Sequence, residues 1–247
     1  MKLLRLLSFA LMSCLLSPAL LRAESSAATA KPARFISQLA AGKPQHVVIF
    51  GTSLSKGGAW VTQMKDALER RFPGLVTLTN GAKSGQNSRW GLANVETNVI
   101  AQRPDVVFIE FSINDAVARF DLSLEESRRN LESILDKITS ALPHCEIILQ
   151  IMNPVVGKPA DDRSYRRDQE KYAEIYRDVA KARGLLAIDH TPAWKAVLAE
   201  GGEAEFKRYV RDGVHPSPEG YAKFVTPTIL AAIGLEPAKS DAAPAKP

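Results

Sequence analysis

Four short stretches of the sequence hold polar residues of the kinds that catalyse acyl transfer. They are residues 51–55, 80–87, 112–115 and 212–216. A serine hydroxyl is a weak nucleophile until a base takes its proton, and a histidine base works best when a carboxylate fixes its tautomer. Backbone N–H groups and an asparagine amide stabilise the negative oxygen of a tetrahedral intermediate. All of these residue types occur in the four stretches, which favours ester chemistry with a nucleophilic serine.

Short β-rich runs alternate with helical patterns around these stretches. The predicted strands are residues 46–50, 75–80, 106–111, 146–152 and 185–189. Several are almost continuously apolar, which is typical of parallel strands covered on both faces. The clearest helix spans 124–142, where apolar residues recur at helical spacing and Ser123 with Glu126 predicts a capping box. Thr191 and Pro192 predict another helix start, with Thr191 as the N-cap.

The alternation of strands and helices predicts a parallel sheet with right-handed crossovers, a three-layer α/β fold. In such sheets ligands bind beyond the carboxyl ends of the strands. The first three polar stretches directly follow the first three predicted strands, and the fourth lies just before the last predicted helix. We therefore expect one domain, over residues 34–234, with its chemistry at the carboxyl edge of the sheet.

The four stretches resemble, in order and in position, the four blocks of the SGNH hydrolases, also called the GDSL esterase/lipase family. The resemblance implies a flavodoxin-like α/β/α sandwich with a five-stranded parallel sheet. It also implies that Ser53 is the nucleophile, His215 its general base and Asp212 the group that orients the imidazole. The implied oxyanion hole consists of the N–H groups of Ser53 and Gly85 and the amide of Asn114.

Two positions depart from the family pattern. Thr52 stands where the family has an aspartate, and Ser112 replaces the glycine two residues before Asn114. Neither change removes a triad or oxyanion group, so the expected class of activity is unaffected. The Gly-Thr-Ser block, followed by residues 57–60, indicates a less characterised bacterial branch.

Other interpretations of single residues compete with this one. Asn114 can be a turn residue that bonds its own backbone, and Asp115 suits a solvated loop. His190 follows the fifth predicted strand, but its neighbour Asp189 points away from it. Residues 51–55 lack the second glycine of the α/β-hydrolase nucleophile elbow, and no P-loop spacing occurs. No metal-ligand spacing occurs either, so we expect no metal and no cofactor.

The flanks of the site contain further candidates for substrate contact. The loop 153–164 follows the fourth predicted strand and suits a lid. Trp60 and Trp90 can stack on a sugar or pack in the core. Three arginines either face an acidic substrate or lie on a solvated helix face: Arg163, Arg166 and Arg167.

The amino-terminal segment has the layout of a secretory signal peptide. A basic start and a mostly apolar run predict a signal peptide over residues 1–23, followed by a linker over 24–33. Residues 235–247 predict a disordered tail. We expect a secreted or periplasmic protein without stable membrane insertion. Lipoprotein processing at Cys14 is the alternative.

Composition and charge limit the other classes of function. The 247 residues are 45% hydrophobic and 24% charged, as in an ordinary globular protein. Three of the cations behind the net charge of +5 lie in the predicted signal peptide: Lys2, Arg5 and Arg22. The remainder is nearly balanced, which argues against a nucleic-acid partner or a polybasic membrane surface. The one cysteine outside the signal peptide, Cys145, is interpreted as a buried, unreactive thiol.

Together these observations predict an exported serine esterase that cleaves a small carboxylic ester through an acyl-enzyme. An O-acetylated carbohydrate is the leading substrate. An O-acyltransferase would use the same residues, and a carbohydrate-binding module that has lost turnover would keep the same fold.

Overall fold

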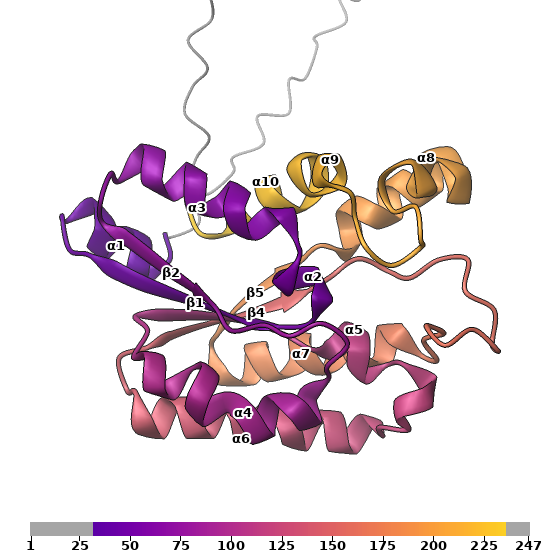
Figure 1. The fold of residues 1–247 in the computed structure, drawn as a ribbon, viewed down its shortest axis with the longest axis horizontal. Coiled ribbons are helices and arrows are strands. Elements are labelled where there is room, and N and C mark those ends of the chain that lie inside the picture. Colours follow the sequence, from indigo (N-terminus) through magenta and orange to yellow (C-terminus); the bar gives the residue numbers. More distant parts are fainter. Residues whose placement is uncertain (1–31, 236–247) are drawn as a thin grey trace, which may run out of the picture.

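A five-stranded parallel sheet runs through the structure, a computed structural model that describes residues 32–235 (Figure 1). Its order is β2-β1-β3-β4-β5, with every neighbouring pair parallel. The strands are β1 Gln45–Gly51, β2 Val76–Asn80, β3 Val106–Glu110, β4 Glu146–Ile151 and β5 Leu186–Asp189. Each predicted strand is confirmed, with ends that differ by one residue at most.

Helices cover both faces of the sheet and complete a three-layer α/β/α sandwich (Figure 1). One face carries α1 Arg34–Ala40, α3 Ala59–Arg71, α8 Thr191–Tyr209 and α10 Thr226–Ala232. The other carries α4 Ser88–Asn98, α6 Leu124–Ala141 and α7 Gln169–Arg183. Short helical segments complete the chain: α2 Ser53–Lys56, η1 Ile100–Gln102, α5 Ser112–Asp115, η2 Ala118–Phe120, α9 Pro218–Gly220 and η3 Tyr221–Val225.

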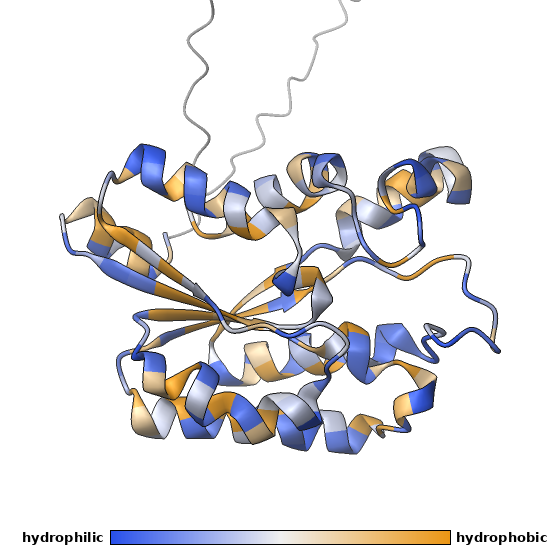
Figure 2. Cartoon of the chain, viewed as in Figure 1, coloured by the Kyte–Doolittle hydropathy of each residue, from blue (hydrophilic) through white to orange (hydrophobic). Residues whose placement is uncertain are grey.

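The hydrophobic core is divided by the sheet into two clusters. Successive residues of a strand point to opposite faces, so Val47 and Ile49 join one cluster while Val48 and Phe50 join the other. Figure 2 shows the strands as mostly hydrophobic and the helices as alternating hydrophilic and hydrophobic residues. This two-sided burial is why the strands read as continuous apolar runs rather than alternating ones.

The two predicted helix starts differ in detail from the structure. Ser123 caps α6, since its hydroxyl accepts the Glu126 N–H at 3.1 Å. The Glu126 carboxylate forms an ion pair with Arg89 on α4 instead of completing a capping box. Thr191 is the first residue of α8 rather than its cap, because the Asp189 carboxylate accepts the Thr191 N–H at 2.9 Å.

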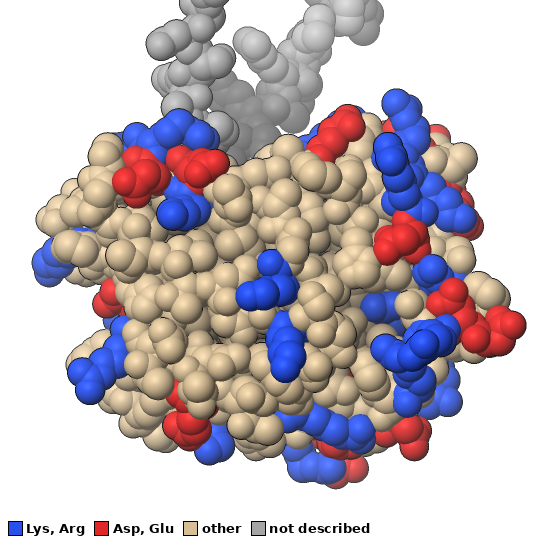
Figure 3. All heavy atoms as spheres, viewed as in Figure 1, with Lys and Arg blue, Asp and Glu red and all other residues tan. Residues whose placement is uncertain are grey.

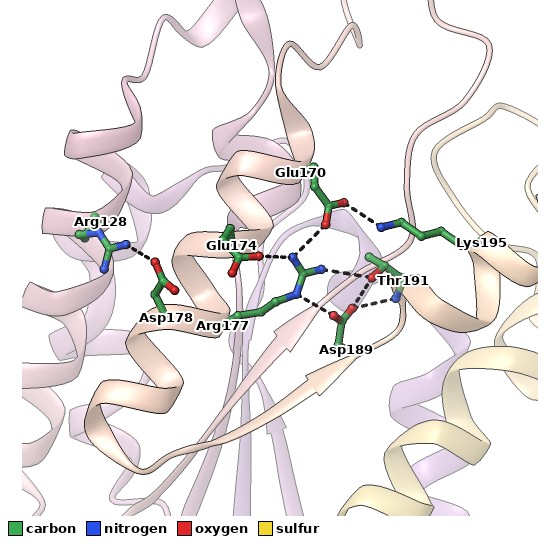
Figure 4. Close-up of polar contacts among 8 residues, drawn as sticks. All are labelled: Arg128, Glu170, Glu174, Arg177, Asp178, Asp189, Thr191 and Lys195. Carbon is green, nitrogen blue, oxygen red and sulfur yellow. Dashed lines mark hydrogen bonds and ion pairs between the residues drawn. The ribbon is translucent and has the colours of Figure 1, made fainter.

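A polar cluster around Arg177 joins α7 to the carboxyl end of β5 (Figure 4). The Arg177 guanidinium donates to Asp189 and to Glu174, both at 2.8 Å, and to Glu170 at 2.9 Å. It also reaches the Thr191 hydroxyl at 3.2 Å. These contacts fix the turn between β5 and α8, the helix that leads into the last polar stretch.

The terminal segments and the surface bear on where the protein acts. The predicted signal peptide, Cys14 and nearly all of the predicted linker and tail lie outside the described residues. Within residues 32–235, no helix is both long enough and apolar enough to cross a membrane. Figure 3 shows acidic and basic side chains spread around one face, without a continuous basic stripe. The free Cys145 thiol is only partly buried, and this burial raises its pKa to about 12, which keeps it protonated at neutral pH.

Candidate active site

The turn between β1 and α2 presents Ser53 at the carboxyl edge of the sheet. Thr52 caps α2 through its hydroxyl, which accepts the Leu54 N–H at 3.2 Å. Ser53 is the first residue of this helix, where N–H groups have no partner within the helix itself. The backbone passes close to β3 at Gly51, where a Cβ atom would lie 2.4 Å from a carboxylate oxygen of Glu110. A glycine is therefore required just before the serine turn.

The buried carboxylate of Glu110, at the end of β3, holds this turn in place. One of its oxygens accepts the Thr52 N–H at 2.7 Å, the Thr52 hydroxyl at 3.0 Å and the Ser55 hydroxyl at 2.7 Å. Burial raises the pKa of Glu110 to about 7, although the three hydrogen bonds favour the charged form. Thr52 thus replaces the family's aspartate with a hydroxyl that binds an acid supplied by the neighbouring strand.

A second buried carboxylate, Asp115, connects α5 to the helices beneath it. It accepts the Ser88 N–H at 2.7 Å and the Ser127 hydroxyl at 2.6 Å, and only 1% of it is exposed. Burial raises its pKa to about 6. The interpretation of Asp115 as a solvated loop residue is therefore wrong. Its carboxylate oxygens are buried and bind the first turns of α4 and α6, two helices far apart in sequence.

Replacing Glu110 with glutamine is expected to flatten the pH dependence of stability. Glu110 binds its proton more tightly when folded, with a pKa of about 7, than at its ordinary value of 4.5. Its contribution to the free energy of unfolding is therefore present below about pH 4.5 and is lost as the pH rises through about 7. Glutamine does not titrate and still accepts from Thr52 and Ser55, so the loss should shrink by about 3 kcal/mol.

Urea unfolding at pH values on either side of this range measures the effect. Asp115 is unchanged in both proteins and leaves a common slope with pH. Glu200→Gln, at an exposed position on α8, is the matched control and should retain the wild-type slope. An identical slope for Glu110→Gln and wild type would contradict the assignment of this titration to Glu110.

The catalytic residues expected from the sequence meet across the carboxyl edge of the sheet. The His215 Nε2 atom lies 2.8 Å from the Ser53 hydroxyl, and the His215 Nδ1 atom lies 2.6 Å from the Asp212 Oδ2 atom. The Asp212 Oδ1 atom accepts two backbone N–H groups, from Val214 at 2.9 Å and His215 at 2.7 Å. Burial opposes ionisation of Asp212, but the hydrogen bonds from His215 and Val214 outweigh it and lower the pKa.

The connection after β4 fastens the turn that carries the histidine. The Asn153 amide donates to the Val214 carbonyl at 2.9 Å, and the Val156 N–H donates to the Gly213 carbonyl at 3.1 Å. Gly213 has φ +77°, and a Cβ atom there would lie 2.1 Å from the Val156 carbonyl oxygen. The compact Asp-Gly-Val-His turn therefore needs glycine for both its conformation and its packing.

A cleft of about 400 Å³ lies beside the serine and the histidine. Gly85 and Asn114, expected to be oxyanion donors, both line it. Gly85 has φ +73°, and Asn114 follows β3 on α5 with 4% of its surface exposed. One N–H of the Asn114 amide donates to the Gln86 carbonyl at 2.8 Å, which leaves the other for a ligand.

The other candidates from the sequence occupy different places. His190 is buried against Gln150 at 3.1 Å, and burial lowers its pKa to about 4, so it takes no part in the cleft. Trp60 is fully buried, and its indole N–H donates to the Leu54 carbonyl. It is therefore a core residue. Trp90 is half-buried and lines a separate hollow of about 480 Å³.

The irregular connection after β4 is longer than predicted, running from residue 152 to residue 168. It contributes Arg163, Ser164 and Arg166 to the lining of the cleft. The arginines do not lie on a helix face, because α7 begins only at Gln169. Within residues 32–235, no group of three or more histidine, cysteine or acidic residues is arranged to hold a metal ion.

Comparisons with known proteins agree on fold and on chemistry. A family model described as the GDSL-like Lipase/Acylhydrolase family matches residues 39–223. The acetylxylan esterase of Geobacillus stearothermophilus is 28% identical over 189 residues, which cover 73% of this chain and 83% of that enzyme. The arylesterase of Vibrio mimicus is 25% identical over 202 residues, which cover 75% of this chain and 88% of that enzyme. The crystal structure of Axe2, an acetylxylan esterase from G. stearothermophilus, has TM-score 0.67 at 24% identity and covers 78% of this chain and 96% of that one.

Proposed function

Because the chain belongs to the GDSL-like lipase/acylhydrolase family and is a carboxylic ester hydrolase, we propose that it is a serine esterase acting through Ser53. The observation that carries the proposal is the continuous contact from the Ser53 hydroxyl through His215 to Asp212, at 2.8 Å and 2.6 Å. Such a contact activates a serine for attack on a carbonyl carbon.

The mechanism has two steps. In the first, the Ser53 oxygen attacks the ester carbonyl carbon while His215 Nε2 takes the hydroxyl proton. The N–H groups of Ser53 and Gly85 and the Asn114 amide stabilise the resulting oxyanion. The intermediate collapses, and His215 returns the proton to the leaving alcohol. In the second step a water attacks the acyl-enzyme in the same way, which releases the acid and restores the serine.

An O-acetylated carbohydrate is the substrate class that fits best. The cleft is small, and its lining combines hydroxyl, amide and guanidinium groups with a single large apolar side chain, Phe120. Such a lining suits a short acyl group on a polar alcohol. The relative that is an acetylxylan esterase supports an acetyl group on a carbohydrate.

Nitrophenyl esters of increasing chain length, followed by acetylated xylan, test this proposal. We expect the highest kcat/KM for the acetate and release of acetate from the polysaccharide. A preference for long acyl chains would contradict the substrate class. Transfer of acetyl groups to added sugar instead of water would favour the acyltransferase, and absence of turnover on every ester would favour the binding module.

The proposed enzyme acts outside the cytoplasm. The support is the signal-like pattern of residues 1–23. The mature chain is expected to begin between Glu24 and Lys31, which N-terminal sequencing of the exported protein measures. A mature chain that begins at Cys14 with a lipid attached would favour the lipoprotein alternative instead.

Replacing Asn114 with alanine is expected to lower kcat by about 10²–10³-fold, the usual effect of deleting one oxyanion donor. KM should change little, since the donor binds charge that develops only in the transition state. Kinetics on 4-nitrophenyl acetate and the melting temperature, measured side by side, test this. A lower melting temperature with normal kcat would return Asn114 to the role of a turn residue.

A further inference from the structure

The guanidinium of Arg166 lies directly behind the Asn114 amide. Its Nη2 atom donates to the Asn114 Oδ1 atom at 3.0 Å, and its Nε atom donates to the Ile113 carbonyl at 3.0 Å. Its third nitrogen donates to the Ser164 carbonyl. Three acceptors from two segments thus hold the planar guanidinium in one orientation, with its charge on the oxygen side of the amide.

These contacts decide which way the Asn114 amide points. The oxygen faces Arg166, and one N–H faces the Gln86 carbonyl. Rotating the amide by half a turn would place its NH₂ group against the guanidinium and its oxygen against the Gln86 carbonyl. Both contacts would be repulsive, so the second N–H stays directed away from these two partners. The positive charge on the oxygen side also polarises the amide and strengthens its N–H as a donor.

Arg166 is charged where it acts. Burial lowers its pKa to about 10, which still leaves it protonated at neutral pH. Within the described residues, Arg166 has no carboxylate in ion-pair distance, and its three hydrogen-bond acceptors are all neutral oxygens. Asp212 and Asp162 act on its charge only from beyond ion-pair distance, so the Asn114 amide is in direct contact with the guanidinium and neither acid is.

We propose that Arg166 is a positioning residue of the oxyanion hole, which fixes and polarises the Asn114 amide for the developing negative charge. The proposal rests on the proposed function, because it gives Asn114 the oxyanion role. Arg166→Met should lower kcat by about 10- to 100-fold, the worth of one charge-assisted hydrogen bond, with little change in KM.

A double-mutant cycle distinguishes this role from a structural one. In the Asn114→Ala background, Arg166→Met should lower kcat no further, because the group through which it acts is gone. Arg166→Lys keeps the charge without the planar guanidinium, so its kcat should lie between the values of the wild type and Arg166→Met. Millimolar guanidinium chloride should partly restore kcat in Arg166→Ala. Arg167→Met, exposed and absent from the cleft lining, is the matched control and should leave kcat unchanged.

Each outcome of the cycle decides a different point. If Asn114→Ala lowers kcat and Arg166→Met lowers it by the same factor in both backgrounds, the positioning role is overturned while the proposed function stands. If Arg166→Met leaves kcat at the wild-type value, the positioning role is also overturned. If Asn114→Ala has no effect on kcat, both the oxyanion role of Asn114 and the positioning role fail.

The mouth of the cleft contains a second, independent feature, a pair of arginines without acidic partners. Arg119 and Arg163 line the cleft and are exposed, and no acidic residue lines it. Neither has a carboxylate within ion-pair distance in residues 32–235. Six arginines elsewhere do have one: Arg89, Arg128, Arg129, Arg177, Arg183 and Arg208. Exposed arginines outside the cleft, such as Arg70 and Arg103, lack one within that range as well. Arg119 stacks instead on Phe120, 4.8 Å from its ring centre, and Phe120 also lines the cleft.

We infer that these two arginines bind a carboxylate on the alcohol half of the ester, so that the preferred substrate is an acetylated acidic sugar. This inference also rests on the proposed function. Two exposed ion pairs should lower KM by about five- to tenfold for an acidic sugar over its neutral counterpart. The preference should weaken as salt is added, because exposed charges are screened.

An O-acetylated methyl hexuronide and the matching methyl hexoside, which differ only in the carboxylate, are the probes. The Arg119→Gln/Arg163→Gln double variant should lose the preference, with a KM for the acidic sugar that rises to the KM for its neutral counterpart. Arg167→Gln should retain the preference. Equal KM values for the two sugars, or a preference that survives in the double variant, would overturn this inference. Absence of turnover on both esters would instead overturn the proposed function.

Discussion

Replacing Ser53 with alanine is expected to lower kcat for ester hydrolysis by about 10⁶-fold, the usual cost of removing a triad nucleophile. Without the hydroxyl, His215 has no proton to take and no acyl-enzyme forms. The fold should be preserved, because the anchoring contacts of the turn come from Thr52 and Ser55 and not from Ser53. Turnover of 4-nitrophenyl acetate and the melting temperature of the purified variant measure both expectations.

Two other serines of the chain provide controls for the assignment of Ser53 as the nucleophile. Ser140→Ala, at an exposed position on α6, should retain normal kcat and stability. Ser55→Ala removes a donor to Glu110 and should lower stability more than Ser53→Ala does. Near-normal turnover in Ser53→Ala, with Ser55→Ala inactive, would move the nucleophile to Ser55 and contradict the assignment.

Replacing Asp212 with asparagine is expected to lower kcat by about 10⁴-fold, because the histidine would adopt the wrong tautomer. The Asp212 Oδ1 atom accepts the N–H groups of Val214 and His215, so the asparagine oxygen would occupy that place. The asparagine NH₂ would then face His215 Nδ1 and donate to it. The proton of His215 would move to Nε2, the atom that must accept from Ser53.

Two observations separate this effect from a loss of structure. The melting temperature of Asp212→Asn should change little, because both backbone donors keep their acceptor. Asp66→Asn makes the same aspartate-to-asparagine replacement at an exposed position on α3, and as the control it should leave kcat unchanged. A loss of kcat that disappears at higher pH would contradict the tautomer explanation, because raising the pH cannot return the accepting nitrogen to the serine.

The sequence was most informative where local pattern and chemistry coincide. Strands covered on both faces need apolar side chains at every position, so β1, β3 and β4 were located to within one residue. The stretches with Ser53 and Asn114 directly follow β1 and β3, and parallel topology must bring such loops to one edge. The stretch with His215 follows the helix α8 instead, so its place at this edge was implied by the family resemblance alone. Topology thus accounts for the convergence of Ser53 and Asn114.

The supporting residues could not be found in this way. Glu110 reads as the polar end of a strand, and its partner Thr52 is 58 residues away in sequence. Arg166 reads as one of several loop arginines, and its partner Asn114 is 52 residues away. In both cases the role depends on burial and on the exact crossing of two loops, which no short-range pattern encodes. The one available signal was Thr52 itself, a hydroxyl in place of an aspartate, which implies that a carboxylate is supplied from elsewhere.

The distance along the chain between the nucleophile and its base also affects how activity appears during folding. Ser53 and His215 are 162 residues apart, and all of the strands after β1 lie between them. Contacts of such long separation close only after the intervening chain is ordered, and they slow folding. Local helices form early and without any sheet. On refolding from denaturant, ester hydrolysis should therefore be recovered later than helical circular dichroism, which makes activity a marker of the completed sheet.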